Sequence, residues 1–270
     1  MQFTNTIGYF IRKTGLTALA DRLRYYVQKF INYRKNNSFI NKNPQLILPP
    51  DYFIYETYTL DYDAYIQDGR ETAREIMALV NEYANLNAPG NRVLDWGCGP
   101  ARIIRHFPSL SENKMQAFGS DYNSAYIEWN KKNIGDVTFL KNELKPPIEI
   151  PDNYFAVIFG LSVLTHLSEE NQKEWIKEMH RILNHGGLLI LTSQGDAFKT
   201  KLTGHEQKSY LEGRGVHRIN KNEGGRTFSS FQPEIYMKEL LADFKLLSYK
   251  QGGLSTTIHG SQDTWIVTKL

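Results

Sequence analysis

The 270-residue sequence has one cysteine and no long apolar run, which argues against a disulfide-stabilised protein and against a membrane-spanning one. The single cysteine, Cys98, excludes an internal disulfide and favours a reducing compartment. No segment approaches the roughly 18 consecutive apolar residues of a membrane-spanning helix, and the N-terminus lacks the compact apolar stretch of a secretory signal. We therefore expect a cytoplasmic protein. The histidines are scattered without the close spacing of metal ligands, so we expect no metal centre.

Acidic residues are almost absent from the first 42 positions. Eight basic residues stand there against one acid, Asp21, so this segment carries +7 and the remainder carries −4. Its apolar residues recur at close to helical spacing, which predicts a basic amphipathic helix: Ile7, Phe10, Ile11, Leu19, Leu23, Val27, Phe30 and Ile31.

Three partners for this helix stay open. It can pack on the body of the protein or on a second subunit with its basic face in solvent. It can instead dock to an acidic partner or an anionic membrane surface, which would place the protein peripherally at the inner face of the membrane. Nucleic acid is the third option, but the acidic balance of the remainder argues against a broad phosphate-binding surface, so we expect no nucleic-acid partner.

The order of apolar and amphipathic segments predicts the domain organisation. Residues 1–50 are expected to form the helical extension and a proline-ended linker, and residues 51–270 the main domain. A helix is predicted over 69–86 and another over 101–108, stopped near Pro108. Strands are predicted at 92–96, 115–121, 137–142, 154–162, 188–193, 245–251 and 264–270, and further helices at 124–133, 169–183 and 233–244, with the glycines at 185–187 ending the second of these.

Alternating strands and helices with apolar strand runs are typical of a doubly wound α/β sheet. In such sheets the ligand lies beyond the carboxyl ends of the strands. The polar residues at the predicted strand ends should therefore cluster there: Asp95, Asp121, Asn142, Ser162 and Ser193.

The stretch VLDWGCGPA, residues 93–101, places an acid and two glycines at the end of the first predicted strand. Gly97 and Gly99 can adopt backbone angles that other residues resist, and they let a ligand approach the main chain. A dinucleotide fingerprint would need a third glycine where Arg102 stands. The carboxylate of Asp95 would also repel a pyrophosphate, whereas it suits an ammonium or sulfonium group.

Asp121 follows Gly99 by 22 residues, at the end of the second predicted strand. A carboxylate at this place can accept both hydroxyls of a ribose. It can also cap the turn before Asn123, and Asp95 can likewise act as a capping acid. Together the two acids and the turn describe a nucleoside with a cationic tail and no phosphate, which S-adenosylmethionine fits.

Four motifs in order then carry a resemblance to a known family. VLDWGCGPA, GSDYN, FAVIFGLSVLTHLSEE and HRILNHGGLLILTS make residues 90–200 similar to class I S-adenosylmethionine-dependent methyltransferases, in particular to domains of methyltransferase type 11 or 12. The resemblance implies a seven-stranded, mostly parallel sheet of Rossmann-like type whose last strand runs antiparallel.

The resemblance also implies roles for cofactor-binding residues. Gly97 and Gly99 would lie against the methionine part and the ribose, Asp95 would order the turn near the amino group, and Asp121 would bind the ribose hydroxyls. The adenine would be met by Tyr122 and by the position of Asn142 and Glu143, where an aspartate is more usual. Leu161 and Ser162 would line the floor after the fourth strand. Arg70 would pair with the cofactor's carboxylate, unless it is an ordinary solvated charge, and Tyr58 is a further candidate.

Candidate residues for the methyl acceptor come from two segments after the fourth strand. His166 is a candidate general base or acceptor contact, and the alternative is that it caps the helix beginning near Ser168. Residues 194–232 are too long for a simple connection and should form a polar lid over the acceptor pocket, or a solvated lid without direct contacts. Candidate acceptor ligands within it are Gln194, His205, Arg214, His217, Arg218 and Arg226.

Three functions remain open on these grounds. The first is a methyltransferase acting on an oxygen or nitrogen atom of a small polar acceptor, such as a glycan or a peptide-like or secondary metabolite. The second is a non-catalytic assembly partner that retains the cofactor fold, against which the intact glycine turn and Asp121 argue. The third is an NAD-dependent oxidoreductase, which Arg102 at the third glycine position disfavours.

Overall fold

The computed structural model describes residues 17–84, 88, 90–112, 114–218, 223–253, 258 and 260–270. The chain divides between Asp68 and Gly69 into two compact units. Ile7, Phe10 and Ile11 of the predicted N-terminal helix lie outside the described residues. Among the described residues, no helix is long and apolar enough to cross a membrane.

The first unit is helical. It contains α2 (Thr17–Lys42), α3 (Asp51–Thr57) and the first turns of α4 (Tyr62–Tyr83). Its small core is built from Ile54, Tyr55, Leu60, Tyr65 and Ile66. The helix α4 begins at Tyr62, earlier than the predicted residue 69, because the main-chain NH of Ala64 and of Tyr65 is accepted by Asp61 at its start.

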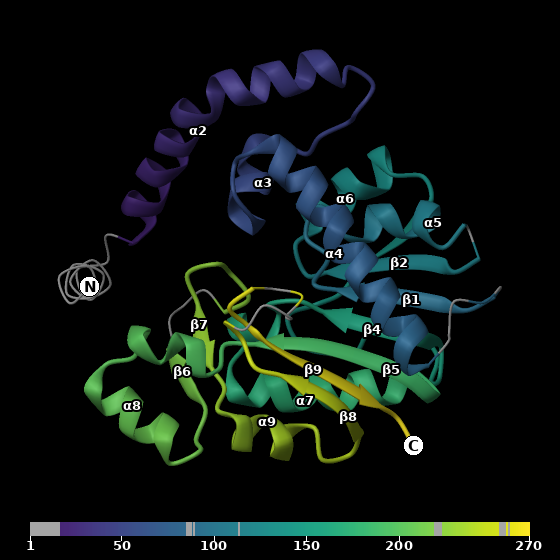
Figure 1. The fold of residues 1–270 in the computed structure, drawn as a ribbon, viewed down its shortest axis with the longest axis vertical. Helices are drawn as coiled ribbons and strands as arrows, with labels where there is room; N and C mark the ends of the chain where they lie inside the picture. The colour runs from purple at the N-terminus through teal and green to yellow at the C-terminus, as the bar shows by residue number, and fades with distance from the viewer. Residues whose placement is uncertain are drawn as a thin grey trace. The chain divides into compact units, whose positions relative to one another are not determined.

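The second unit is built on a seven-stranded sheet, ordered β3-β2-β1-β4-β5-β9-β8 (Figure 1). The strands are β1 (Arg92–Trp96), β2 (Gln116–Asp121), β3 (Val137–Lys141), β4 (Phe155–Gly160), β5 (Leu183–Ser193), β8 (Lys245–Lys250) and β9 (Asp263–Thr268). The first five run parallel, and β9 is antiparallel to both of its neighbours. This confirms the expected mostly parallel sheet with an antiparallel last strand.

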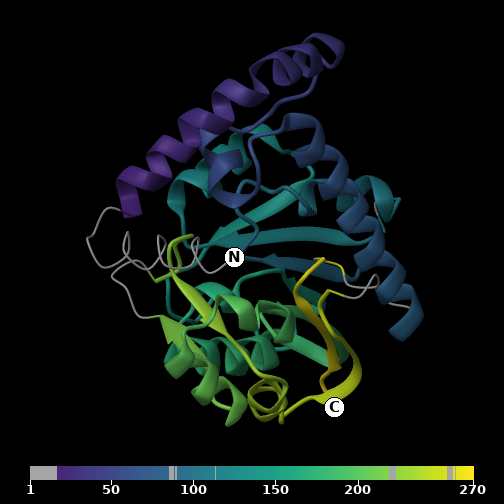
Figure 2. The same ribbon diagram turned by 60° about the vertical axis from the view of Figure 1, so that its left-hand side comes forward.

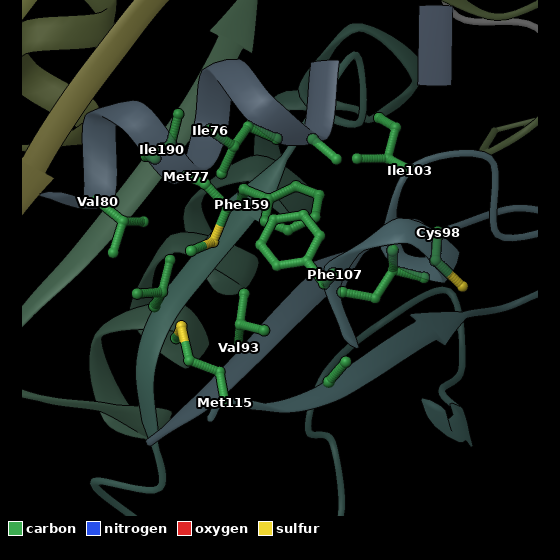
Figure 3. Close-up of a cluster of buried hydrophobic side chains, with 14 of the residues drawn as sticks. Ile76, Met77, Val80, Val93, Cys98, Ile103, Phe107, Met115, Phe159 and Ile190 are labelled. Carbon is green, nitrogen blue, oxygen red and sulfur yellow. The ribbon is translucent and has the colours of Figure 1, made fainter. Parts of the chain in front are cut away.

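Helices cover both faces of this sheet (Figures 1 and 2). The residues of α4 from Gly69 onward, α5 (Phe107–Leu110) and α6 (Ser124–Asn133) pack on one face, and α7 (Glu169–Ile182) and α9 (Glu234–Leu240) pack on the other. The face packed by α4, α5 and α6 forms what we call the first core of the sheet, and the face packed by α7 and α9 forms the second. Successive strand residues point to opposite faces, so Val93 lies in the first core and Leu94 in the second. Figure 3 shows the first core, in which Phe107 stacks on Phe159 with ring centroids 5.3 Å apart.

The predicted helix over 101–108 is wrong in its position. Ala101 has a positive φ of 59°, which a right-handed helix does not allow, and a short 3-10 turn, η1 (Ile104–His106), comes first. Pro108 does not stop the helix but lies in the first turn of α5. A proline is tolerated there because its missing NH would have had no helical partner.

The glycines at 185–187 do not end α7. The helix ends at Ile182, and Leu183 is already extended. The amino group of Lys269 donates to the carbonyls of His180 and Leu183, at 2.7 and 3.0 Å, and so satisfies the helix end. Gly186 instead donates its NH to the Lys269 carbonyl, 2.8 Å away, at the start of β5.

The insertion at 194–232 has elements of its own. They are η3 (Asp196–Lys201), α8 (Gly204–Leu211) and an antiparallel pair of strands, β6 (Val216–Arg218) and β7 (Ser229–Phe231). A small core of Leu202, Tyr210, Val216 and Phe231 holds them together. The strand β7 is tied to η2 (Leu164–His166), because the Ser230 hydroxyl donates to the Leu164 carbonyl at 2.9 Å.

Candidate functional site

The glycine turn follows β1 and is held by main-chain hydrogen bonds to β2. The NH groups of Gly97 and Cys98 both donate to the Ser120 carbonyl, at 2.8 and 2.9 Å. Gly97 has a φ of 75° and Gly99 a φ of 51°. A methyl group at Gly97 would lie 2.5 Å from Cγ2 of Val163, so this position needs glycine for both its backbone angle and its space.

Asp121 joins the end of β2 to the turn. Its buried carboxylate accepts the Gly99 NH at 2.9 Å through Oδ2 and the Asn123 NH at 2.8 Å through Oδ1. The capping role weighed from the sequence is therefore present. Each carboxylate oxygen can accept more than one hydrogen bond, so the same side chain can still receive a pair of hydroxyls.

Asp95 lies in β1, 3 % exposed and beside the Asp121 carboxylate. Burial raises the pKa of Asp95 to about 8, the nearby Arg102 opposes this rise, and the charge of Asp121 adds to it. Two buried acids close together favour a cation beside them. Cys98 lies in the same turn, buried, and burial followed by the charges of Asp95 and Asp121 raises the pKa of its thiol, so we interpret it as a structural turn residue.

The predicted adenine contacts lie after β2 and β3. Asn142 donates its main-chain NH to the Asp121 carbonyl at 3.1 Å, so the ends of the two strands meet. Its amide nitrogen donates to the Glu143 carbonyl at 2.7 Å, while its buried Oδ1 has no hydrogen-bond partner among the described residues. The Glu143 side chain is exposed and pairs with Lys141. Tyr122 is 40 % exposed.

Arg70 lies next to a close contact between α4 and the segment after the glycine turn. A methyl group at Gly69 would lie 2.3 Å from the main-chain oxygen of Arg102, so the two backbones touch. The Arg70 side chain is exposed. Burial, followed by the charges of Arg105, Arg70, Arg102 and Arg74 in that order, lowers the pKa of His106 to about 4. The structure therefore places Arg70 in a region of positive potential.

Ser162, shortly after β4, is hydrogen-bonded to β5 and to the residue before β9. Ser162 has a φ of 66°, donates its NH to Thr192 Oγ1 at 2.8 Å, and receives the Gln262 amide at its hydroxyl at 2.5 Å. Leu161 is half-buried against the first core. Ser193, expected in the same cluster, has its hydroxyl taken by the Trp265 indole NH at 2.9 Å. Of the five strand-end residues, the structure thus joins Asp95, Asp121 and Asn142 most directly.

His166 does not cap α7, and that alternative is wrong. Ser168 is the capping residue and accepts the Asn171 NH at 3.4 Å. The Nδ1 atom of His166 lies 3.1 Å from the Phe228 carbonyl oxygen. A carbonyl oxygen can only accept, so Nδ1 carries the proton and Nε2 keeps its lone pair. Burial lowers the pKa of His166, against the main-chain contacts with Phe228 and Gly225 and in the same direction as the charge of Arg226.

The insertion reaches both predicted ligand regions through Gly224. The Gly224 NH donates to the His166 carbonyl at 2.9 Å. A methyl group at Gly224 would lie 3.0 Å from Cζ of Tyr122 and 2.9 Å from Cδ1 of Leu144. The segment around Gly224 therefore bridges the predicted adenine side and His166.

Three other predicted acceptor ligands, Arg226, Gln194 and His217, differ in their surroundings. Arg226 is half-buried, and its charge acts on His166 by lowering the pKa of the imidazole. Gln194 is tied by its main chain to Gln232, whose NH donates to its carbonyl at 2.9 Å. His217 packs its ring against Tyr236 with centroids 5.9 Å apart, and burial lowers its pKa.

The remaining candidates are exposed or have other contacts. His205 is exposed on α8, Arg214 pairs with Glu212, and Arg218 pairs with Glu206 at 2.9 Å. Tyr58, in the first unit, donates its hydroxyl to Asp68 at 2.6 Å.

Sequence reasoning missed three residues that shape the site. Val163 stands against Gly97, Gln262 links Ser162 to Thr192, and the Phe228 carbonyl fixes the tautomer of His166. Gln262 and Phe228 lie outside the motifs, and Val163 stands in one of them without a chemical role that marks it. A contact between residues 62 or 100 positions apart leaves no local pattern that could have predicted it.

The sheet order together with an acid-bearing glycine turn defines the class I methyltransferase fold. Comparisons with known proteins agree. Residues 93–187 match a family model described as a methyltransferase domain. A putative S-adenosylmethionine-dependent methyltransferase from Listeria monocytogenes shares the fold with a TM-score of 0.54 at 14% identity, over 73% of this chain and 99% of that one. The glycopeptide N-methyltransferase MtfA, solved with S-adenosyl-L-methionine, does so with a TM-score of 0.52 at 11% identity, over 75% and 95%.

Two curated relatives have sequences similar to parts of this chain. The ubiquinone/menaquinone biosynthesis C-methyltransferase UbiE of Ectopseudomonas mendocina is 29% identical over 112 residues, which span 38% of this chain but only 41% of that protein. An uncharacterised methyltransferase of Anoxybacillus flavithermus is 21% identical over 165 residues, 59% of this chain and 76% of its own length. Residues 93–187 therefore match a methyltransferase domain, and the chain has the fold of S-adenosylmethionine-dependent methyltransferases.

The residues of the turn fit the cofactor of this family. The turn presents glycine main chain where a side chain would collide, and two buried acids stand beside it. The buried Asn142 Oδ1 lacks a partner among the described residues and is suited to accept an exocyclic amine. Asp121 would hold the ribose and Asp95 the cationic end. When bound, S-adenosylmethionine supplies an activated methyl group on a sulfonium.

Proposed function

We propose that the protein transfers a methyl group from S-adenosylmethionine to an oxygen or nitrogen atom of a small polar acceptor. The observation that carries the proposal is the tautomer of His166, which makes it a candidate base. Its Nδ1 proton is held by the Phe228 carbonyl, so Nε2 is left as a proton acceptor, and its lowered pKa keeps the ring neutral near pH 7. Oxygen and nitrogen acceptors lose a proton when they gain a methyl group, and His166 Nε2 would take it.

The rest of the site would act by positioning and by excluding water. A sulfonium donor is already activated, so methyl transfer needs mainly alignment of the two reacting atoms. The insertion supports this role, because Gly224 bridges His166 and Tyr122 and Arg226 lies near His166. The half-buried Arg226 favours an acceptor with a carboxylate, phosphate or other anionic or polar group.

The acceptor class proposed is a glycan or a peptide-like or secondary metabolite. It is supported by the polar composition of the insertion. MtfA acts on a glycopeptide by its name, but at 11% identity it speaks for the fold alone. UbiE is by its name a C-methyltransferase, and the match covers less than half of it. Neither name assigns the acceptor atom of this chain.

Titration separates this function from the two alternatives. We expect S-adenosylhomocysteine to bind at micromolar concentration in calorimetry and NAD not to bind. Binding of neither compound would favour the assembly partner, and binding of NAD alone would favour the oxidoreductase. A screen of glycan, peptide and phenolic acceptors with a labelled methyl donor then identifies the acceptor, and labelling of carbon acceptors alone would contradict the assignment to oxygen or nitrogen.

A further inference from the structure

The helix α2 turns its polar side inward and its apolar side outward. Gln28 accepts the Leu60 NH at 3.0 Å, and the buried Asn36 accepts the Tyr62 NH at 3.0 Å. Asp21 accepts the Tyr55 hydroxyl at 2.9 Å on the same side. These polar contacts, together with Tyr25 and Phe39, which pack against the core of the first unit, hold α2 in place. The other large apolar residues of α2 are left outside, unlike those of the usual surface helix.

The opposite side of α2 is an exposed apolar stripe. We call this the α2 apolar face, formed by Leu19, Leu23, Tyr26, Val27, Phe30 and Tyr33. Residues three and four apart share one side of a helix, so these six lie together. Phe30 is 84 % exposed and Leu19 is 67 % exposed, where an apolar side chain of a surface helix is normally covered. Leu19, Leu23, Val27, Phe30 and Ile31 are therefore exposed rather than packed into the core of the first unit.

Three exposed arginines, Arg22, Arg24 and Arg34, border the α2 apolar face. At 100° per residue, Arg22 and Arg24 fall on its two flanks and Arg34 falls at its C-terminal end. All three are exposed, and they form no ion pair with the residues that the structure describes. Lys29 and Lys35 are instead paired within the unit, with Asp51 at 2.7 Å and Asp61 at 2.5 Å. The acid Asp21 lies on the opposite side of the helix.

We propose that the α2 apolar face lies in the surface of an anionic lipid bilayer. An apolar stripe buries in the acyl boundary while arginines on its flanks meet the anionic headgroups, and this combination is that of an interfacial helix. Self-pairing of the face by two-fold symmetry would gather the arginines of both copies at one interface, while Asp21 lies on the opposite side of α2, and this excess of positive charge opposes a dimer. The proposal does not rest on the proposed methyl transfer, since it concerns α2 alone.

Vesicle flotation of the full chain tests the proposal. The probes are vesicles of phosphatidylcholine alone and of phosphatidylcholine mixed with phosphatidylglycerol. We expect binding to the mixed vesicles that weakens as salt is raised. Replacing the three arginines together, Arg22→Gln with Arg24→Gln and Arg34→Gln, should lower the partition coefficient roughly 100-fold, since each basic residue near an anionic surface contributes about fivefold. Leu23→Ser with Phe30→Ser should lower it at least about tenfold.

Matched variants elsewhere control for charge and for apolar surface. Lys131→Gln with Lys132→Gln and Lys177→Gln removes the same charge from exposed sites on α6 and α7, and Ile235→Ser removes an apolar side chain that is 59 % exposed on α9. Both should bind vesicles as the unaltered chain does. Titration with S-adenosylhomocysteine checks that each variant keeps its second unit folded.

Three results would overturn the proposal. One is absence of binding to the mixed vesicles. Another is binding that the control variants reduce as much as the α2 variants do. The third is a dimer in sedimentation velocity that Leu23→Ser with Phe30→Ser abolishes, without any vesicle binding by the unaltered chain, which would assign the face to self-association.

Discussion

The two halves of the candidate site are built by different means. The cofactor half, from Trp96 to Asn142, is made of strand ends and main-chain hydrogen bonds, with Ser120 and Asp121 anchoring the glycine turn. In the acceptor half, from Leu161 to Gln232, side chains form hydrogen bonds to main-chain groups that are distant in the sequence, as His166 does with the Phe228 carbonyl. The first half is thereby suited to one unvarying ligand, and the second to a ligand that differs between relatives.

Removal of His166 should have the largest effect and should fall on the acceptor half alone. His166→Ala is expected to lower kcat about 10²- to 10⁴-fold with the acceptor found by screening, because a positioned base contributes that much. The affinity for S-adenosylhomocysteine should stay within about twofold. If both quantities fall together with the melting temperature, His166 holds the structure rather than taking a proton.

Asp121→Ala should break the cofactor half. We expect S-adenosylhomocysteine to bind about 1.5–3 kcal/mol more weakly, the size of hydrogen bonds to a charged group. Calorimetry measures the change, and Asp121→Asn, which keeps one acceptor oxygen, should lie between the two. An unaltered affinity for Asp121→Ala would remove this residue from the ribose site.

The pH dependence of cofactor affinity should sharpen the role of Asp95. Its pKa is raised to about 8, so the carboxyl is largely protonated below that pH. The positively charged amino group of S-adenosylhomocysteine would bind the ionised form, so its affinity should rise with pH, by up to about tenfold per unit, and level off above the raised pKa. In Asp95→Asn this slope should vanish. A slope that persists in that variant would assign the titration to another group.

Gly97→Ala should have the smallest effect on binding free energy but a clear effect on stability. The new methyl group would lie 2.5 Å from Val163 Cγ2, at a φ of 75°. We expect a loss of about 1–3 kcal/mol in unfolding free energy, measured by denaturant titration. The double variant with Val163→Ala relieves the collision but not the backbone angle, so it should recover only part of the loss.

The difference between the halves also explains what the sequence could predict. The strands and the place of Asp95, Gly97, Gly99 and Asp121 follow from local patterns, since apolar runs end on polar residues and glycines mark the turn. The antiparallel last strand was predicted only from the resemblance to a family. The start of α5 could not be predicted, because the left-handed angle at Ala101 carries no residue signature. The end of α7 depends on Lys269, almost 90 residues further along the chain.

The acceptor half could be predicted only as a region. The length and polarity of residues 194–232 marked an insertion, and His166 stood out by its place after the fourth strand. That the Phe228 carbonyl would orient His166, and that Gly224 would reach Tyr122, depends on how the insertion packs. Charge and residue type alone could not separate Arg226, near His166, from Arg218, which is held by Glu206.

The carboxylate of Glu223 accepts both the Ser168 NH and the Asn171 side-chain amide, each at 2.7 Å. Residues at the end of the insertion thereby fasten the first turn of α7. Any excursion of that segment away from the sheet must expose the Ser168 amide to water. The rate of deuterium uptake at the Ser168 amide would then report how often the end of the insertion moves away, as the entry of an acceptor and the release of a product would require.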